Sequence, residues 1–278
     1  MKSNDNYTTK EHYVPQFYLK YFAGSDGKIS CIFVKDKKYC RVAPKTICCE
    51  KNIYETMDDN GHTYARNYLE NYFSQVEGHM AILFNNIIER CHDAKNQEAL
   101  ILSSGEKEDI ANYLSIQYLR HPIAKNEHNN MIEEFLGKPL NKLEKNIMYT
   151  QNDFLSDSSG SEPIFKINGK NMIESESFSF FMPKDNTKHF FTSDFPVWAD
   201  ITQSKTDIRS YYFPLSPNIA ICMRDRKAVP INWKNNIVKI DDKHVDQINA
   251  FTIRCAPQII LGKDFSTGEK KFICNRLS

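Results

Sequence analysis

The spacing of apolar residues changes along the chain, and this change constrains the fold more than any other feature. Between residues 64 and 90, apolar side chains recur at steps of three and four, which is the period of an amphipathic helix. This stripe consists of Leu69, Phe73, Val76, Met80, Leu83 and Ile87. After residue 177, short apolar runs are separated by turn residues, as is typical of strands. The chain therefore predicts helices first and a β-rich part later.

The other expected elements follow from the same patterns. We expect a short helical turn at 17–22, a β-hairpin at 28–42 and two helices at 106–121 and 124–136. Later strands are expected at 178–182, 189–192, 210–215, 219–223 and 258–261, with one late helix at 241–254. This order predicts an α+β fold with an N-terminal hairpin, a central helical bundle with one long helix, and a mostly antiparallel C-terminal sheet.

The length of 278 residues is compatible with one large domain. We expect a single domain over 1–278, with a hairpin and helical part at 10–137 and a β-rich part at 177–278. Between these parts, at 138–176, the apolar signal thins, and a run rich in Ser, Gly and Asp occupies 156–162. This composition predicts an insertion or a linker.

The composition argues against several classes of protein. Hydrophobic residues make up 41% of the chain, which is enough for a packed core. The net charge of +1 argues against a broad basic face for duplex DNA. No run approaches the length of a membrane span and the first residues lack a signal sequence, so we expect a cytoplasmic protein with no membrane contact. The eight cysteines contain no Cys-x-x-Cys pair, which predicts reduced thiols and no zinc site.

Polar side chains occur where apolar ones are expected. His12 and Gln16 lie on either side of a proline in an aromatic and aliphatic segment, so both need partners if they are buried. Glu77 lies on the apolar flank of the long helix with no cation four residues away. It must therefore find a partner elsewhere, or lie in water at the rim of that face. Glu70 follows Arg66 by four residues, which predicts a surface ion pair.

Two further helices carry polar residues on their apolar faces. In the 106–121 helix, Gln117 lies in the middle of the apolar stripe and Arg120 lies at its edge. They are three residues apart, so they can act on the same target. A buried Arg normally pairs with a carboxylate or a phosphate, which leaves an internal bridge and a role in a site both open. In the late helix, Asn249 is expected to fix the register or to cap a backbone group.

Asp194 follows an expected strand and precedes a turn at Pro196. Carboxylates just past strand ends often form sites on mixed folds. The alternative is a local turn in which Asp194 bonds its own backbone near Pro196. Both interpretations are open from the sequence.

Together these motifs resemble a mainly bacterial family known as domain of unknown function 4238. The resemblance rests on the His12–Phe22 opening, Asn52-Ile53-Tyr54, Glu77, Gln117–Arg120, Phe191–Pro196 and Pro214–Pro217, and it extends from about residue 10 to 262. It implies a bacterial or phage-related source and a single compact domain. It also implies that His12, Gln16, Glu77, Gln117, Arg120 and Asp194 belong to the family's motif set. The family carries no established activity.

The first functional hypothesis is a hydrolase of phosphoester, nucleotide or nucleic-acid bonds. In this hypothesis His12, with Gln16 beside it, is the general acid or base, because histidine titrates near neutrality. Glu77 and Asp194 hold Mg²⁺ or Mn²⁺ or activate water. Arg120 stabilises developing negative charge and Gln117 orients water or substrate.

The second hypothesis is a non-catalytic module that senses a ligand or binds a partner, in phage defence or in a toxin system. The polar residues then form a structural network that holds the N-terminal segment. The sequence contains no Walker loop, no nucleophile elbow and no dinucleotide fingerprint. Geometry separates the two hypotheses: convergence on an open pocket favours the enzyme, whereas a dry bridge between Arg120 and Glu77 disfavours it.

Overall fold

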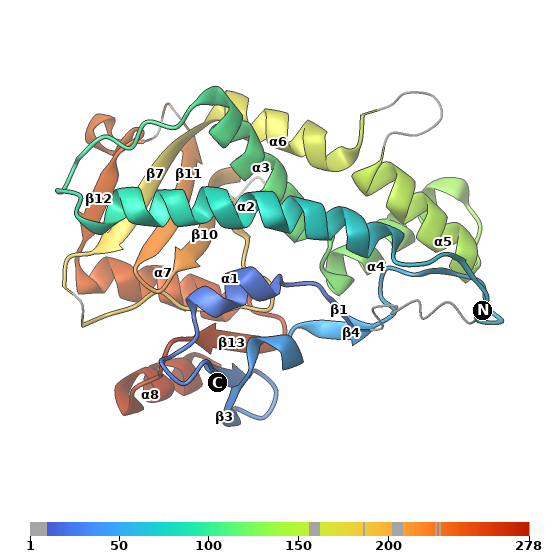
Figure 1. Ribbon diagram of the computed structural model, residues 1–278, viewed down its shortest axis with the longest axis horizontal. Coiled ribbons are helices and arrows are strands. Elements are labelled where there is room, and N and C mark those ends of the chain that lie inside the picture. The colour runs from blue at the N-terminus through green and yellow to red at the C-terminus, as the bar shows by residue number, and fades with distance from the viewer. Residues whose placement is uncertain are drawn as a thin grey trace, which may run out of the picture.

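A five-stranded sheet forms the centre of the computed structural model (Figure 1). The structure describes residues 10–277, except for 156–161, 186, 202–207, 226 and 228. In spatial order the central strands are β12 (Ile237–Ile240), β7 (Glu176–Pro183), β11 (Ile219–Asp225), β10 (Ile208–Ser216) and β9 (Trp198–Ile201). All neighbouring strands are antiparallel except β12 and β7, which are parallel.

Helices cover both faces of this sheet. They are α1 (Gln16–Tyr21), α2 (Tyr68–His92), α3 (Ser104–Leu119), α4 (Pro122–Leu136), α5 (Lys142–Tyr149), α6 (Ile164–Ser175), α7 (Asp242–Cys255) and α8 (Thr267–Arg276). The long helix α2 crosses in front of β7, β10 and β11 in Figure 1, and its Phe84 ring lies 5.8 Å from the Phe213 ring of β10. On the other face, Val245 and Ile248 of α7 pack with Phe181. Successive side chains of a strand point to opposite faces, so the central sheet contributes to one hydrophobic core on each of its faces.

A second sheet joins the two ends of the chain. Its order is β3 (Tyr39–Val42), β2 (Ile29–Phe33), β13 (Ile259–Gly262) and β8 (Thr192–Ser193). All its pairs are antiparallel, and β13 lies between the N-terminal hairpin and β8. The remaining short elements are β1 (Lys10–His12), β4 (Cys49–Lys51), β5 (Thr56–Met57), β6 (Thr63–Ala65), and short helical turns at Pro44–Thr46, Thr150–Phe154 and Ile231–Trp233. Of the helices in the described ranges, none is long and apolar enough to cross a membrane.

The structure confirms the α+β class, the N-terminal hairpin and the long helix, and it corrects other expectations. The segment at 138–176 is no plain linker in its described part, because it contains α5, a turn at 150–154 and α6. Tyr149, Phe154, Phe165 and Met172 from this segment are buried in the main core. The apolar periodicity of α5 and α6 is weak because each of these helices buries only a few side chains. The run at 156–162 lies mostly outside the described residues.

Three further expectations differ from the structure. Most of the strand expected at 189–192 is irregular, because Asn249 takes its backbone groups: Phe191 N–H donates to Asn249 Oδ1 and Asn249 Nδ2 donates to the His189 carbonyl, both over 2.8 Å. This confirms the backbone-capping role expected for Asn249. The strands β9 and β12 were not expected, and neither was α8. In α8 Ile273 is the one buried residue, so this helix has no apolar stripe to read.

Candidate functional site

The N-terminal arm, which we define as residues 11–22, is held by two side chains of one helix turn. Gln117 Nε2 donates to the carbonyl oxygen of Tyr13 over 2.7 Å. One turn further along, Arg120 Nη2 donates to the carbonyl oxygen of His12. The two residues thus bind neighbouring groups of the arm, as their spacing of three allows. The structure gives their shared target as the backbone of the arm.

Arg120 is almost fully buried, and its charge has several partners. Its Nη1 donates to Glu77 Oε1 over 2.8 Å, and Glu77 keeps 24% of its side chain exposed. The guanidinium lies 4.3 Å from the centre of the Phe73 ring, which adds a cation–π contact. Burial opposes the charge, but Tyr54 and Glu77 raise the pKa of Arg120 above its usual value. Arg120 therefore stays charged, with its carboxylate partner inside the protein.

The helix α3 that carries these side chains has a well-defined start. Ser103 accepts from the backbone of Glu106, and the Glu106 carboxylate accepts from the Ser103 backbone. This capping box fixes the first turn. At the other end, Tyr54 donates its hydroxyl to the Arg120 carbonyl over 2.7 Å, which holds the last turn.

His12 and Gln16 lie beside each other at the start of α1. Gln16 Nε2 is 3.4 Å from His12 Nδ1, so the imidazole accepts from the amide in the neutral form. Burial lowers the pKa of His12. The imidazole is therefore uncharged at neutral pH, and it is the His12 carbonyl that contacts Arg120.

Asp194 is fully buried and binds the backbone of another strand. Its Oδ1 accepts from Ile259 N–H over 3.1 Å and from Gln258 N–H over 3.4 Å. Burial raises the pKa of Asp194 to about 6. The turn after β8 is made by Ser193 instead, whose Oγ accepts from Phe195 N–H over 3.1 Å. Of the two interpretations that the sequence leaves open for this loop, the local turn near Pro196 is made by Ser193, whereas Asp194 binds the backbone of the β13 segment.

Tyr18 links the motifs on which the family resemblance rests. Its hydroxyl donates to the Pro214 carbonyl over 2.6 Å and lies 2.6 Å from Thr192 Oγ1. The ring stacks on Phe213 with centroids 4.9 Å apart. The opening motif, the 191–196 loop and the 214–217 turn therefore meet around α1.

The network also contains ionisable residues that the sequence did not indicate. Glu11 is fully buried and accepts from Tyr54 N–H over 2.9 Å, and burial raises the pKa of Glu11 to about 7. Burial likewise raises the pKa of Glu70 to about 7, and this side chain is half-buried with an inaccessible Oε2, so it does not lie fully on the surface. Lys125 donates to the Ile53 carbonyl over 2.5 Å, and burial lowers the pKa of Lys125 to about 8. Glu11 precedes His12 in the sequence, but it follows a polar segment, and no residue spacing there indicates that Glu11 is buried.

The expected metal pair has separate partners. Glu77 Oε1 contacts Arg120, whereas Asp194 Oδ1 contacts backbone amides of the β13 segment. Among the residues that the structure describes, no group of three or more His, Cys, Asp or Glu side chains is arranged to hold a metal ion. A metal at Glu77 and Asp194 stays a prediction that no contact here supports.

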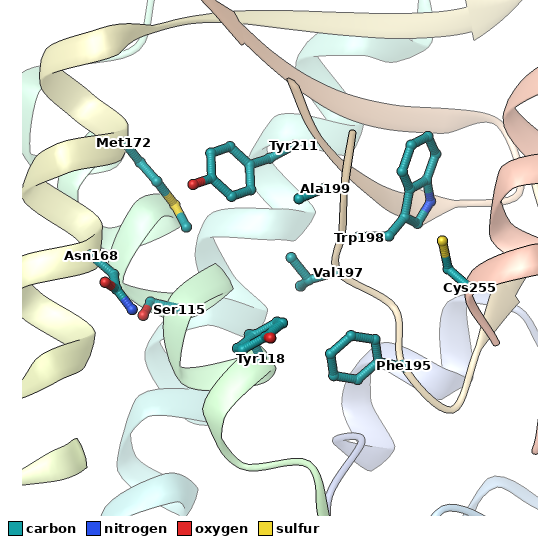
Figure 2. A pocket seen from close by; sticks show the side chains of 10 residues that line it. All are labelled: Ser115, Tyr118, Asn168, Met172, Phe195, Val197, Trp198, Ala199, Tyr211 and Cys255. Carbon is teal, nitrogen blue, oxygen red and sulfur yellow. The ribbon is translucent and has the colours of Figure 1, made fainter. Parts of the chain in front are cut away.

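A cavity of about 490 Å³ lies next to this network (Figure 2). Its lining residues are Ser115, Tyr118, Asn168, Met172, Phe195, Val197, Trp198, Ala199, Tyr211 and Cys255. We call it the aromatic pocket. These residues include no charged side chain and none of the six predicted site residues. Of those six, Gln16 lines a separate open cavity of about 610 Å³ beside Lys20 and Lys45.

Two lining residues of the aromatic pocket carry polar atoms with no hydrogen-bond partner within the described part of the chain. They are Ser115 Oγ and Trp198 Nε1, and both residues are buried. The indole of Trp198 is fixed by stacking on Tyr212, with centroids 4.2 Å apart, and on Phe251, at 5.2 Å. Both atoms have almost no accessible surface, so they lie behind the wall of the cavity and do not face it. Because the lining comes from five separate regions of the chain, no local motif could have indicated it.

The fold and the site together define an α+β protein in which a buried polar network holds the N-terminal arm on α3, and in which α3 also lines an uncharged aromatic pocket. The family described as Protein of unknown function (DUF4238) matches residues 10–266, so the chain belongs to this family. Searches of the curated proteins and of the solved structures found no match.

Proposed function

We propose that this protein is a non-catalytic ligand-binding module, and that its aromatic pocket binds a small, neutral, mainly apolar molecule. The observation that carries the proposal is the lining of the pocket, which has no charged side chain and is mainly aromatic and aliphatic. A volume of about 490 Å³ lies in the usual range of small-molecule sites. The ligand would pack mainly against the aromatic and aliphatic side chains of the lining.

The polar network gives a second argument for the proposal, because its contacts do not favour catalysis. Arg120 donates through its two Nη atoms to Glu77 and to the arm, which leaves only its Nε without a partner among the described residues, and Gln117 Nε2 also donates to the arm. A catalytic Arg or Gln needs donors that point at the reacting atoms. Burial lowers the pKa of His12, and its Nδ1 is already engaged by Gln16 Nε2 at 3.4 Å. Hydrolysis of phosphoester or nucleotide bonds is therefore the less supported hypothesis, and a role in phage defence or as a toxin stays a prediction.

A matched pair of probes tests the proposal against the hydrolase hypothesis. 1-Naphthol is neutral, aromatic and carries one hydroxyl, whereas 1-naphthyl phosphate adds a dianion and a hydrolysable bond. We expect saturable binding of 1-naphthol by calorimetry and little binding of the phosphate, because burying an unpaired charge in an uncharged pocket is costly. We also expect no phosphate release with Mg²⁺, Mn²⁺ or EDTA.

Ala199→Leu fills the pocket wall and should weaken 1-naphthol binding by about tenfold or more, since overpacking costs about 1–3 kcal/mol. Ala81→Leu, a half-buried position on α2 outside this lining, is the matched control and should bind normally. Undiminished binding by Ala199→Leu, or no binding by the wild type, would reject the pocket. Phosphate release that is lost in both His12→Ala and Asp194→Ala would establish the hydrolase hypothesis instead.

A further inference from the structure

Two cysteines lie directly opposite each other in the N-terminal hairpin. Cys31 of β2 is the register partner of Cys40 of β3, and their Sγ atoms are 2.9 Å apart as free thiols. Directly opposed residues of antiparallel strands have Cα atoms about 4.5–5.5 Å apart. That separation lies within the Cα range of about 4.4–6.8 Å that a disulfide spans. We propose that Cys31 and Cys40 are a site of reversible disulfide formation, with a small-molecule disulfide as the oxidant.

The two thiols have different access to solvent. Cys31 has no exposed surface and belongs to the main core, whereas Cys40 is half-buried on β3, the last strand of its sheet. An oxidant from solution therefore meets Cys40 first. Burial, together with the neighbouring Cys40, raises the pKa of Cys31 to about 12, so Cys31 has little thiolate of its own. Its role is to attack the Cys40 sulfur from the protein interior, after that sulfur has formed a mixed disulfide with the oxidant.

The exchange balances with one oxidant molecule. The Cys40 thiolate attacks one sulfur of the small disulfide, breaks its S–S bond and releases one small thiolate. Cys31 then loses its proton to a base or to the leaving thiolate and attacks the Cys40 sulfur, which expels the second small thiol. Two protein thiols are oxidised, one small disulfide is reduced to two thiols, and a new S–S bond joins β2 to β3. A reducing thiol reverses the sequence.

The bond would fix a strand that supports the C-terminal helix. Arg41 on β3 contacts both Asp26 and Asp264, at 2.7 and 2.6 Å. Tyr39 on the same strand lies under the ammonium group of Lys270 of α8, 3.6 Å from the ring centre. A cross-link within the hairpin restricts the unfolded chain and should stabilise this region in the oxidised state.

The test uses the full-length protein with oxidised glutathione, followed by alkylation under denaturing conditions and peptide mass spectrometry. In the wild type we expect a Cys31–Cys40 linked peptide and no retained glutathione. In Cys31→Ala the resolving thiol is missing, so glutathione should stay on Cys40. In Cys40→Ser, Cys31 should remain a free thiol. The Ala and Ser replacements are chosen to suit a buried and a half-buried position, and circular dichroism checks that both variants fold.

Several results would overturn the proposal. One is a wild-type protein that keeps both thiols free, and another is glutathione held stably on wild-type Cys40. A third is a link from Cys31 to Cys48, another buried cysteine of the main core. As a second readout, oxidation should raise the unfolding midpoint of the wild type, dithiothreitol should reverse the rise, and Cys40→Ser should show none. An unchanged wild-type midpoint would contradict the stabilising effect.

Discussion

Gln117 donates its side-chain amide to the backbone carbonyl of Tyr13 over 2.7 Å, and this bond ties α3 to a segment 104 residues away in sequence. Arg120 repeats the contact one turn later at the carbonyl of His12. Carbonyls buried in a core need donors, and these two side chains supply donors at the end of β1 and in the β1–α1 connection. The most conspicuous polar residues of α3 therefore act on the backbone that precedes Pro15.

The first prediction concerns this amide. Gln117→Leu leaves the buried Tyr13 carbonyl without its donor, so the free energy of unfolding should fall by about 1–3 kcal/mol. Urea denaturation measures the change. Glu108→Gln, exposed on the same helix, should change stability by less than about 0.5 kcal/mol. Equal stability of Gln117→Leu and wild type would mean that the bond contributes nothing.

The second prediction separates the two partners of Arg120. Arg120→Met removes the bonds to Glu77 and to the His12 carbonyl, whereas Glu77→Gln removes one charge at a partly exposed position. We expect Arg120→Met to cost about 3–5 kcal/mol and Glu77→Gln clearly less. The double variant should reveal a coupling energy of about 0.5–3 kcal/mol between them. If Glu77→Gln proved the more destabilising, the arm would not be the main partner of Arg120.

The third prediction concerns pH. Burial raises the pKa of Glu70 from 4.5 to about 7, so the folded state holds this proton more tightly than the unfolded state does. The stabilising contribution is complete below pH 4.5 and is lost as the pH rises through 7. Glu70→Gln has no such proton to lose. Its stability relative to wild type should therefore rise between pH 4.5 and 8, by at most about 3 kcal/mol. A profile for Glu70→Gln that runs parallel to the wild-type profile would contradict the raised pKa of Glu70.

The fourth prediction concerns the contact between α3 and α6 beside the aromatic pocket. A Cβ at Gly169 would lie 2.1 Å from Asn112 Oδ1 and 3.3 Å from its backbone nitrogen. Gly169→Ala should therefore destabilise the protein by about 1–3 kcal/mol, as overpacking does. Gly78→Ala in α2 meets nothing within 4 Å and should stabilise by up to about 1 kcal/mol, because Ala is the better helix former. Thermal unfolding of the two variants checks whether Gly169→Ala lowers stability and Gly78→Ala raises it. Unchanged stability of Gly169→Ala would show that α3 and α6 can move apart to admit the methyl group.

Local periodicity was sufficient for the elements whose own sequence determines them. The stripe from Leu69 to Ile87 predicted α2, and the turn between 33 and 39 predicted the hairpin. The sequence could not show that the segment expected as a strand at 189–192 is mostly irregular, because its backbone is bound by Asn249, about 60 residues away. Tertiary partners of this kind override local preference.

The same limit applies to the site. The spacing of Gln117 and Arg120 predicted a common target, but the target is a pair of backbone carbonyls, which leave no mark in a sequence. The sequence predicted that five polar residues lie together, because each occurs in an apolar segment or on an apolar helix face. They are His12, Gln16, Glu77, Gln117 and Arg120. Asp194 was expected in the same site, and it binds backbone amides at the start of β13 instead.

Hydrogen exchange in the N-terminal arm tests most directly whether the polar residues lock it in place. The experiment compares wild type with Gln117→Leu and follows backbone amides of the arm, including Tyr13, which donates to the Cys48 carbonyl over 3.0 Å. We predict faster exchange from Tyr13 to Phe22 in the variant, with unchanged exchange in the strands β7 and β11. Unaltered protection of the arm, together with the loss of an enzymatic activity in Gln117→Leu, would contradict the structural lock.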